Sequence, residues 1–487
     1  MTRRVLLALL AAGLVAPLGC WGSPATAATK PAKPYDFDGN GRQELVASAT
    51  GLLVGDPTNY DAGGVVVLPN VRGRIPLEPR LVTKDTPGLE DEPIEGDRFG
   101  RGLASADFDR DGYADLIVST STYQGHGQGV GVLTVIPGSS GGLDSARSTG
   151  LRYTGRYDED NPTGLSSVLV AADLTGDGYP DLAAGATDGT VLVFVGGTRG
   201  LTQASARALE GRGPGGGSQD EDRGFGSSLA AGDLDGDGRA DLVVGSYGSN
   251  RPGDAYPGSV SVCPGAAGGP TGCTRLAHSF DYAGPTSVAI GHVTGAARPD
   301  LVVAVPEPTP DAVGSVRILR LRPTGPVAED RTLVLTQSGR GVPGVDEPKD
   351  SFGISLALAD LNRDGFADLV VGAPGENRGS GRVTVVHGAK GGWRTSGNRT
   401  YDQGTRGIPG KAEVSDRFGS SVTLLDHDGD GRLDLDVGAP GENASGAVTT
   451  LRGAGTGFTT KGSQTFGLKT LGIGPVERAA FGDPLGG

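Results

Sequence analysis

The sequence predicts an all-β protein assembled from seven copies of one structural unit. A ten-residue pattern, Asp-x-Asp-x-Asp-Gly-x-x-Asp-Leu, begins at Asp36, Asp107, Asp173, Asp233, Asp360 and Asp426, and a degenerate copy begins at His292. A recurring pattern with a nearly constant period is typical of a repeat protein. The composition agrees with short strands joined by turns, because the chain has 87 Gly and 32 Pro and its apolar runs are short and β-branched.

Repetition also explains how 487 residues can form one body. A single hydrophobic core stops growing at roughly 250–300 residues. Repeats avoid this limit because each unit buries its apolar face against its neighbours.

The first residues are typical of a secretory signal, with Arg3 and Arg4 before an apolar stretch and Ala25-Thr26-Ala27 as a cleavage site. We therefore expect residues 1–27 to be removed, residues 28–34 to form a short linker, and residues 35–487 to form the repeat domain. No later apolar stretch is long enough to span a membrane, so we expect a secreted, extracellular protein.

The export route and the anchoring stay open. The paired arginines fit both the general secretory (Sec) route and the twin-arginine (Tat) route. Leu18-Gly19-Cys20 resembles a lipoprotein processing site, but Pro17 stands where such sites carry an aliphatic residue.

Two cysteines remain after removal of the signal, Cys263 and Cys273. An oxidising compartment favours a disulfide between them. The intervening PGAAGGPTG is typical of a hairpin tip, so we expect a local cross-link.

The formal net charge of −14 has a specific origin. The six intact copies of the pattern alone contain 21 acidic residues. If these bind cations, the acidity needs no basic partner, and binding of nucleic acid is disfavoured because its backbone is itself negative.

Two further elements flank the acidic pattern. A Phe-Gly pair lies eight residues before its first Asp, at Phe99, Phe225, Phe352 and Phe418, and Gly-Ala-Pro follows at 372–374 and 438–440. Together these elements resemble the FG-GAP repeats of the N-terminal domain of integrin α-subunits and of many secreted bacterial proteins. The resemblance covers residues 35–487 and implies a seven-bladed β-propeller, each blade a four-stranded antiparallel sheet.

The ends of the chain predict how such a ring closes. The pattern at Asp36 has no Phe-Gly before it, whereas Phe481-Gly482 has no acidic pattern after it. We therefore expect the C-terminal segment VERAAFGDPL to pair with the N-terminal segment in one blade. Two units depart from the pattern: the third has Leu165-Ser166 in the Phe-Gly position, and the fifth has Gly284-Pro285 and a turn without metal ligands.

The acidic pattern also predicts calcium binding, since Ca²⁺ prefers six to eight oxygen ligands. Each intact copy offers side-chain oxygens at positions 1, 3, 5 and 9 and the backbone carbonyl of position 7, while Gly at position 6 permits the turn. An EF-hand is excluded, because it needs a Glu at position 12 and flanking helices. We expect about six structural Ca²⁺ sites. The predicted ligands are Asp36, Asp38, Asn40, Arg42, Glu44; Asp107, Asp109, Asp111, Tyr113, Asp115; Asp173, Thr175, Asp177, Tyr179, Asp181; Asp233, Asp235, Asp237, Arg239, Asp241; Asp360, Asn362, Asp364, Phe366, Asp368; and Asp426, Asp428, Asp430, Arg432, Asp434.

The alternative is that these segments are merely Asp-rich turns, since Asp and Gly favour turns without any metal. Six repetitions of alternating oxygen positions argue against it. In the fifth unit only Asp300 keeps a carboxylate, which is too few for a site.

No catalytic residue is predicted. The five histidines form no metalloprotease pattern, and His427 falls at a position that we expect to face solvent. Residues 138–142 match Gly-x-Ser-x-Gly, but a nucleophile elbow joins a strand to a helix, and a hairpin tip is expected here.

The function that the sequence favours is a secreted, integrin-like module for binding or adhesion, with Ca²⁺ as scaffold and an extracellular protein or glycan as ligand. We expect a monomer. The Tyr- and Gly-containing segments 59–64, 121–129 and 246–259 are either a binding face or plain hairpin loops. A hydrolase of esterase, phospholipase or glycosidase type at the channel mouth and an inert wall-associated protein are the alternatives.

Overall fold

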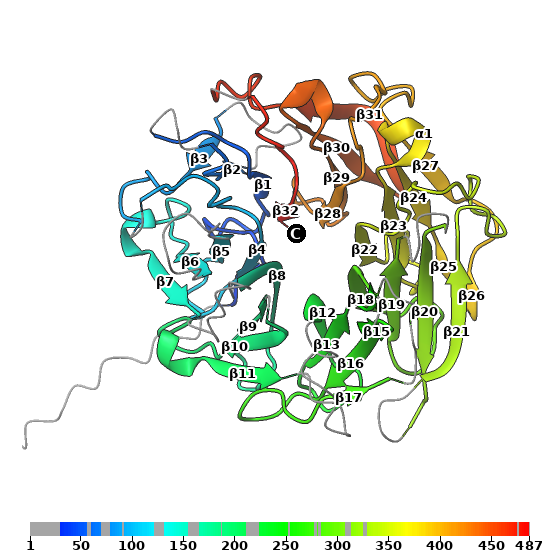
Figure 1. Ribbon diagram of the computed structural model, residues 1–487, viewed down its shortest axis with the longest axis horizontal. Coiled ribbons are helices and arrows are strands. Elements are labelled where there is room, and N and C mark those ends of the chain that lie inside the picture. Colours follow the sequence, from blue (N-terminus) through cyan, green and yellow to red (C-terminus); the bar gives the residue numbers. More distant parts are fainter. Residues whose placement is uncertain are drawn as a thin grey trace, which may run out of the picture.

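The computed structural model is a ring of seven four-stranded antiparallel sheets, the blades, arranged around one axis (Figure 1). The predicted all-β class and the number of blades are confirmed. The structure describes residues 30–486 apart from 56–59, 70–77, 90–91, 121–130, 154–164, 187, 211–223, 252–253, 277–279, 281–283, 307–312, 325–328 and 475–476.

The first four blades share one order, from the strand nearest the axis to the outer edge. They consist of β32 (Leu485–Gly486), β1 (Leu45–Ala49), β2 (Gly64–Leu68) and β3 (Arg80–Val82); β4 (Leu103–Ala106), β5 (Asp115–Thr120), β6 (Val132–Ile136) and β7 (Thr149–Arg152); β8 (Leu165–Ala172), β9 (Asp181–Ala186), β10 (Thr190–Phe194) and β11 (Arg207–Glu210); and β12 (Phe225–Gly232), β13 (Asp241–Ser246), β16 (Ser259–Cys263) and β17 (Thr274–Arg275).

The last three blades follow the same order. They consist of β18 (Ser287–Gly291), β19 (Asp300–Val305), β20 (Ser315–Leu321) and β21 (Glu329–Leu335); β22 (Leu356–Ala359), β23 (Asp368–Ala373), β24 (Arg382–Val386) and β27 (Arg399–Tyr401); and β28 (Ser421–Leu425), β29 (Asp434–Ala439), β30 (Ala447–Ala454) and β31 (Gly457–Phe466).

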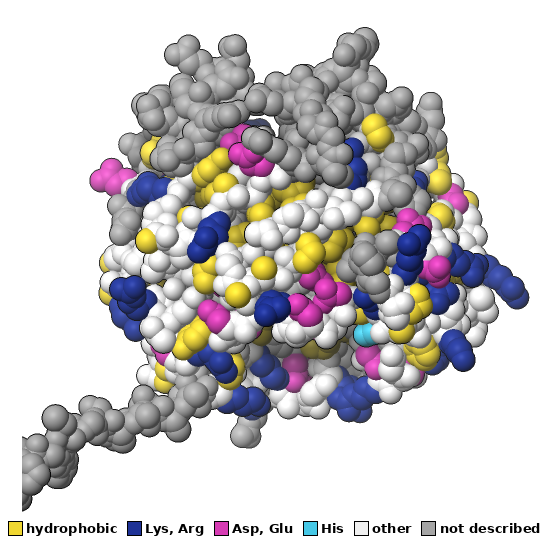
Figure 2. Space-filling view, turned by 90° about the horizontal axis from the view of Figure 1, so that it is seen from below, with side chains coloured by type: hydrophobic (Ala, Val, Ile, Leu, Met, Phe, Trp, Pro, Cys, Tyr) yellow, Lys and Arg dark blue, Asp and Glu magenta, His cyan; other side chains and the backbone are white. Residues whose placement is uncertain are grey.

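Short elements decorate the loops. Two hairpins consist of β14 (Ser249–Arg251) with β15 (Asp254–Tyr256) and of β25 (Gly388–Ala389) with β26 (Gly392–Trp393), and the helical turns are α1 (Glu376–Gly379), η1 (Ser145–Arg147), η2 (Gln203–Ser205) and η3 (Glu442–Ala444). Within the described residues no helix is long and apolar enough to span a membrane. Seen from one side, acidic, basic and hydrophobic side chains are mixed over the surface of the ring (Figure 2).

The ring is closed by the two ends of the chain. The innermost strand of every blade contacts the innermost strands of both neighbouring blades, so the contact runs from β4 to β32 and back to β4. The C-terminal strand β32 pairs antiparallel with β1, with Val46 opposite Gly486 and Ala47 opposite Leu485. The predicted sharing of the first blade between the N- and C-terminal segments is confirmed.

The Phe of each Phe-Gly pair packs in the core between two consecutive blades, and we call this buried side chain the plug. Phe99, Phe418 and Phe481 are fully buried, and the N–H of Phe99 donates to the carbonyl of Ala62 in the preceding blade at 2.9 Å. The facing residue is a glycine, Gly63, because a Cβ there would lie 2.5 Å from the Phe99 backbone. The plug therefore needs a glycine in the blade before it as well as the Phe.

The two departing units solve the same packing problem differently. Leu165 is buried in place of the Phe of the third unit. In the fifth unit the buried side chain is Phe280, whose N–H donates to the carbonyl of Gly258 at 3.0 Å. Phe280 lies four residues before the expected position, so a search at fixed offsets misses it.

The N-terminal segment is ordered against the ring from residue 30 onward. The N–H of Ala32 donates to Asp107 at 3.0 Å, Lys33 lies 3.8 Å from Asp426, and the N–H of Tyr35 donates to Ser105 at 2.8 Å. The predicted signal, residues 1–27 with Cys20, lies outside the described residues.

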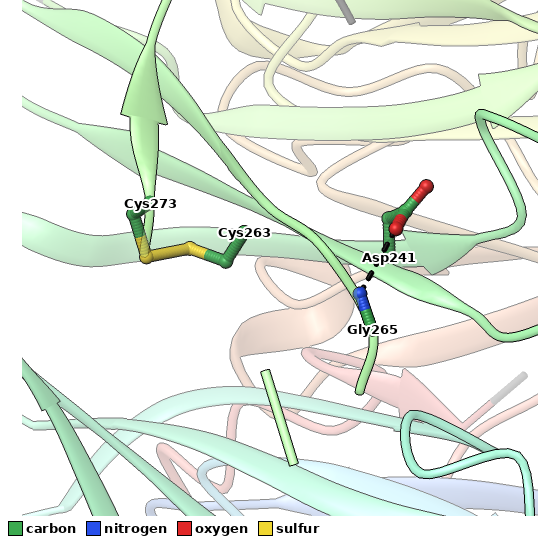
Figure 3. Close-up of a disulfide and its surroundings, with 4 residues drawn as sticks. All are labelled: Asp241, Cys263, Gly265 and Cys273. Atoms are coloured by element: carbon green, nitrogen blue, oxygen red, sulfur yellow. Dashed lines mark hydrogen bonds between the residues drawn. A yellow bond between two sulfur atoms is a disulfide. The ribbon is translucent and has the colours of Figure 1, made fainter. Parts of the chain in front are cut away.

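The two cysteines lie at the outer edge of the fourth blade. Cys263 ends β16 and Cys273 precedes β17, and a disulfide joins them (Figure 3). It staples the short outer strand to its neighbour.

Candidate metal centre

The ten-residue acidic patterns form one set of turns, here called the acidic loops and numbered first to seventh in chain order. The second to seventh loops join the innermost strand of their blade to the second strand, and the first loop leads into β1, the second strand of the first blade, so all seven lie at the same end of the ring. In the six intact loops, the carboxylate at position 1 accepts a hydrogen bond from the N–H of the glycine at position 6. The donors are Gly41, Gly112, Gly178, Gly238, Gly365 and Gly431, at 2.8–3.1 Å.

Position 9 is a buried carboxylate that ties three strands together. Asp241 accepts from the N–H of Leu234, at position 2, at 2.9 Å and from the N–H of Gly265 at 3.0 Å (Figure 3). The same second bond recurs in four more blades, where the donors are Gly138, Gly196, Gly388 and Gly453. The acidic pattern alone predicts position 9 as a ligand and does not predict this structural role. The recurring glycine after the third strand was the available signal for this second role.

Four of the six intact loops bring three carboxylates together, with one oxygen of each within 4.8 Å of the others. Positions 1 and 3 are always members, and the third member is at position 5 or position 9. The clusters are Asp36, Asp38 and Glu44; Asp107, Asp109 and Asp111; Asp233, Asp235 and Asp241; and Asp426, Asp428 and Asp430.

The other predicted acids lie outside these clusters. In the fourth loop, Asp237 is 2.8 Å from the guanidinium of Arg239 instead. In the second and seventh loops, Asp115 and Asp434 are held by glycine N–H groups.

The third and sixth loops form no such cluster because a neutral side chain occupies position 3. Thr175 replaces the acid in the third loop. In the sixth loop Asn362 turns its amide nitrogen to Asp368 at 3.2 Å, and His387 lies 3.1 Å from the same carboxylate. Asp364 pairs with Arg394. These two loops therefore have fewer free oxygens than the other four.

Two observations test whether a cation fits. Buried oxygens without a hydrogen-bond partner point into three of the loops: Oδ1 of Asp36, Oδ1 of Asp426 and Oδ1 of Asn362. Burial, with neighbouring carboxylates adding to it, raises the pKa of Glu44 to about 8 and that of Asp115 to about 7. Both features are relieved by a hard divalent cation, so the residues present fit one.

A bound cation would neutralise the carboxylates of a loop and cross-link positions that are otherwise held only by hydrogen bonds. The chain's own contribution is to preform the turn. Gly178, for example, has φ of 89°, a left-handed conformation that favours glycine, and its N–H fixes Asp173.

The fifth loop satisfies its remaining carboxylate internally. Thr294 donates its N–H to Asp300 at 2.8 Å and its hydroxyl to the other oxygen at 2.9 Å. Both oxygens of Asp300 therefore have hydrogen-bond donors from Thr294, and this turn needs no metal ion.

One expectation was wrong. His427 does not face solvent: it is buried, and its Nε2 lies 2.7 Å from Oδ2 of Asp436. Position 2 of the loop points into the blade, so a polar residue there needs a buried partner.

The Gly-x-Ser-x-Gly match at residues 138–142 is a tight turn between β6 and β7. The hydroxyl of Ser139 donates to the carbonyl of Gly142 at 2.7 Å, and the N–H of Gly142 donates back at 2.8 Å. The serine of the match itself, Ser140, is exposed in this turn, and the chain continues through a three-residue helical turn into β7 rather than into the helix that follows a nucleophile elbow.

Comparisons with known proteins agree with this architecture. The FG-GAP repeat family matches residues 99–136, 165–201, 225–263, 352–386 and 418–451. Integrin alpha-7 of Homo sapiens is 30% identical over 265 residues, which are 50% of this chain and 21% of that protein. Integrin alpha pat-2 of Caenorhabditis elegans is 33% identical over 229 residues, 44% of this chain and 18% of that protein.

A second group of relatives carries an enzyme name. Phosphatidylinositol-glycan-specific phospholipase D of Bos taurus is 41% identical over 97 residues, 19% of this chain and 11% of that protein. The chain thus spans about a fifth or less of the length of these curated relatives. Among solved structures, an exotype rhamnogalacturonan lyase aligns with 84% of this chain and 70% of its own, with a TM-score of 0.40 and 12% identity.

Proposed function

Because this chain is an FG-GAP repeat protein with an integrin-α-like β-propeller, we propose that it is a calcium-stabilised module that binds an extracellular protein or glycan. The fold is that of a ligand-binding module. The finer assignment to calcium and to secretion is supported by the observations below, and we further propose that the module acts in adhesion as a monomer and without catalysis.

The observation that carries the proposal is the placement of exposed apolar side chains. Among the described residues seven large hydrophobic side chains are exposed, and five of them lie on loops at the end of the ring opposite the acidic loops. These five are Tyr60, Ile94, Tyr247, Val345 and Val414. Exposed aromatic and aliphatic side chains on the loops at one end of the ring can serve as anchors for a ligand.

The topology makes this end the adaptable one. Its loops join the second strand to the third and each blade to the next, whereas the acidic loops constrain the other end. Two of the Tyr-containing segments singled out in the sequence contribute here through Tyr60, 61% exposed, and Tyr247, 46% exposed. Segment 121–129 lies outside the described residues.

Secretion is supported by the disulfide, because such bonds persist in oxidising compartments. Calcium is supported by the four carboxylate clusters and the unpartnered buried oxygens. We assign the ion a structural role, since the clusters and the proposed binding face lie at opposite ends of the strands.

Chelation tests the calcium scaffold. A site with Kd near 0.1 mM contributes about 1.4 kcal/mol at 1 mM calcium, so several sites together approach the whole stability of a typical domain. We expect chelator to lower the melting temperature by about 10 °C or more, and calcium to restore it. The substitution Asp38→Asn should weaken this response, whereas Asp61→Asn, which changes a half-exposed acid beside Arg98 at the other end, should not. A melting temperature that chelator leaves unchanged contradicts the scaffold.

Surface capture tests the binding function. Immobilised protein should retain a ligand from cell-surface extracts or glycan arrays, and the double substitution Tyr60→Ala with Tyr247→Ala should reduce retention at least ten-fold, the loss of about 1.4 kcal/mol that anchor side chains typically exceed. The matched control is Leu81→Ala with Val334→Ala, two exposed apolar residues on outer strands. Failure of the unaltered protein to retain any ligand contradicts the binding function.

A further inference from the structure

The acidic loops contact one another around the ring through position 7. In four junctions the side chain at position 7 lies on the glycine at position 4 of the preceding blade's loop. A methyl group on Gly39 would lie 3.1 Å from the ring of Tyr113, and one on Gly295 would lie 2.6 Å from the ring of Phe366. The other two pairs are Arg239 on Gly176 and Arg42 on Gly429.

Where position 4 is an arginine, the contact runs in the other direction. The guanidinium of Arg110, in the second loop, lies 5.7 Å from the ring centre of Tyr179 in the third. In the sixth loop, Nη2 of Arg363 donates to the carbonyl of Gly431 in the seventh at 2.6 Å. The acidic pattern predicts a role for the backbone carbonyl of position 7 only. Its side chain, however, has a recurring neighbour.

Backbone hydrogen bonds reinforce three of these junctions. The N–H at position 8 donates to the carbonyl of position 1 in the preceding loop: Ala114 to Asp36 at 3.0 Å, Ala240 to Asp173 at 2.9 Å, and Ala367 to His292 at 2.9 Å. At these three junctions the first residue of one acidic loop is therefore held by the next loop.

One junction lacks the packing contact. The position-4 glycine of the fourth loop is Gly236, and no atom lies within 4 Å of where its Cβ would stand. The gap falls between the fourth loop and the fifth, which has lost its ligands. The six intact loops thus form an unbroken series around the ring, from the sixth through the seventh and first to the fourth.

We propose that the six intact acidic loops are one coupled series, in which a cation bound in one loop raises the affinity of its neighbour through the contacts between position 4 of one loop and position 6 or 7 of the next. The inference rests on the calcium sites proposed above. Position 7 offers its carbonyl to a cation, so binding orders the same residue whose side chain contacts position 4 of the adjacent loop. Position 4 lies between the predicted ligands at positions 3 and 5, so a contact at position 4 can influence how these two ligands are placed for a cation.

The junction between the sixth and seventh loops gives the sharpest test. Position 8 of the seventh loop is Leu433, and within the described residues the hydrogen bond between these two loops is that of Arg363 to Gly431. Arg363 is exposed and has φ of 60°. Asn tolerates this conformation and is too short to reach Gly431, so Arg363→Asn removes the contact without straining the turn.

The experiment follows hydrogen exchange of the peptide that covers residues 426–434 while Ca²⁺ is added to the chelator-treated full chain. Disabling the sixth loop with Asp364→Ala should raise the Ca²⁺ midpoint of the seventh loop about five-fold, the lower end of typical coupling between sites. In the Arg363→Asn background the same substitution should leave that midpoint unchanged, and Arg363→Lys should restore the shift. Lys411→Asn, which removes an exposed cation at the other end of the same blade, controls for net charge.

The possible outcomes distinguish the coupling between loops from the calcium sites on which it rests. An equal shift with and without Arg363, or no shift in either background, overturns the coupling while the calcium sites stand. Exchange that does not respond to Ca²⁺ in any acidic loop overturns the proposed sites themselves, and the coupling with them.

Discussion

Position 2 of the acidic loop shows how one residue exchange requires another. It is apolar and buried in six blades, as at Leu361, and is His427 in the seventh. The residue ten places after the start of the loop is the buried Val370 in the sixth blade and the buried Asp436 in the seventh. Burial opposes the charge on His427, but Asp436 outweighs it and raises the pKa of His427 to about 9. An apolar contact has been replaced by an ion pair.

Restoring the apolar pair should therefore work only when both residues change. His427→Leu alone leaves the carboxylate of Asp436 buried without its partner, and should lower the free energy of unfolding by about 3–5 kcal/mol. The double substitution His427→Leu with Asp436→Val should lie within about 1 kcal/mol of the unaltered protein or above it. Urea titration at pH 7 in saturating calcium measures both. Additive losses in the double variant would contradict the pairing.

The sequence predicted the role of a residue correctly where that residue has one structural role, and incompletely where it has two. Alternating oxygens and the glycine at position 6 identified the turns, because few other roles need that spacing. The hydrogen bond from Gly265 to Asp241 and the burial of His427 beside Asp436 were not predicted. In both cases the partner lies outside the acidic loop or at its end, about ten to 24 residues along the chain.

At the junctions between blades, too, a change of one buried residue is accompanied by a change in its partner. In the sixth blade a buried carboxyl, Asp350, faces Glu376, which accepts a hydrogen bond from Gln337 at 2.7 Å and lies 2.8 Å from Arg382. The seventh blade repeats the carboxyl pair and the glutamine, with Asp416, Glu442 and Gln403. In the second blade the residue equivalent to Gln337 is Lys84, and the residue equivalent to Asp350 is Asp97. The ammonium of Lys84 lies 2.9 Å from the carboxylate of Asp97.

These two kinds of junction should respond oppositely to pH and to amide substitution. Burial, followed by Glu376 and Glu347, raises the pKa of Asp350 from 3.8 to about 7. The folded state therefore holds a proton that the unfolded chain releases, and stability should fall as pH rises between about 4 and 7. Asp350→Asn should remove this fall and be stabilising at pH 8, with no advantage below pH 4.

The second blade provides the matched comparison. Asp97→Asn leaves the buried ammonium of Lys84 without a counter-charge, and should cost about 3–5 kcal/mol at pH 8. Denaturant titrations at pH 4, 6 and 8 in saturating calcium measure both variants. If Asp350→Asn destabilises at pH 8 as Asp97→Asn does, the two carboxyl groups of the sixth blade are not in repulsive contact.

Elements were predictable where the repeat is regular and not where it drifts. The period and the Phe-Gly elements predicted the seven blades and the blade that is shared by both chain ends. Phe280 escaped because the fifth unit reaches the same buried site from four residues earlier in the chain. Burial of a large side chain against Gly258 is what the fold requires, and the motif is only the usual way to supply it.

At the scale of the whole molecule, closure distinguishes this ring from an open array of repeats. In an open array the end units have one neighbour each, whereas in a ring every blade is packed on both sides. Here closure depends on a short strand, because β32 pairs with two residues of β1 and the N–H of Ser48 adds a bond to Pro484 at 3.0 Å. β32 also contacts both β28 and β4, so it joins three blades at once.

Removal of residues 477–487 should therefore destabilise the ring at one place rather than evenly. The truncation leaves β1 with an unpaired edge and breaks contacts to the second and seventh blades, so hydrogen exchange should accelerate in β1, β4 and β28 while β12 and β18, on the far side, stay protected. A synthetic peptide covering residues 477–487 should restore protection in trans, because it supplies the missing strand without altering the rest of the chain. Uniform acceleration in all seven blades would mean that the blades do not depend on closure locally, and failure of the peptide to act would mean that the strand must be covalently attached to close the ring.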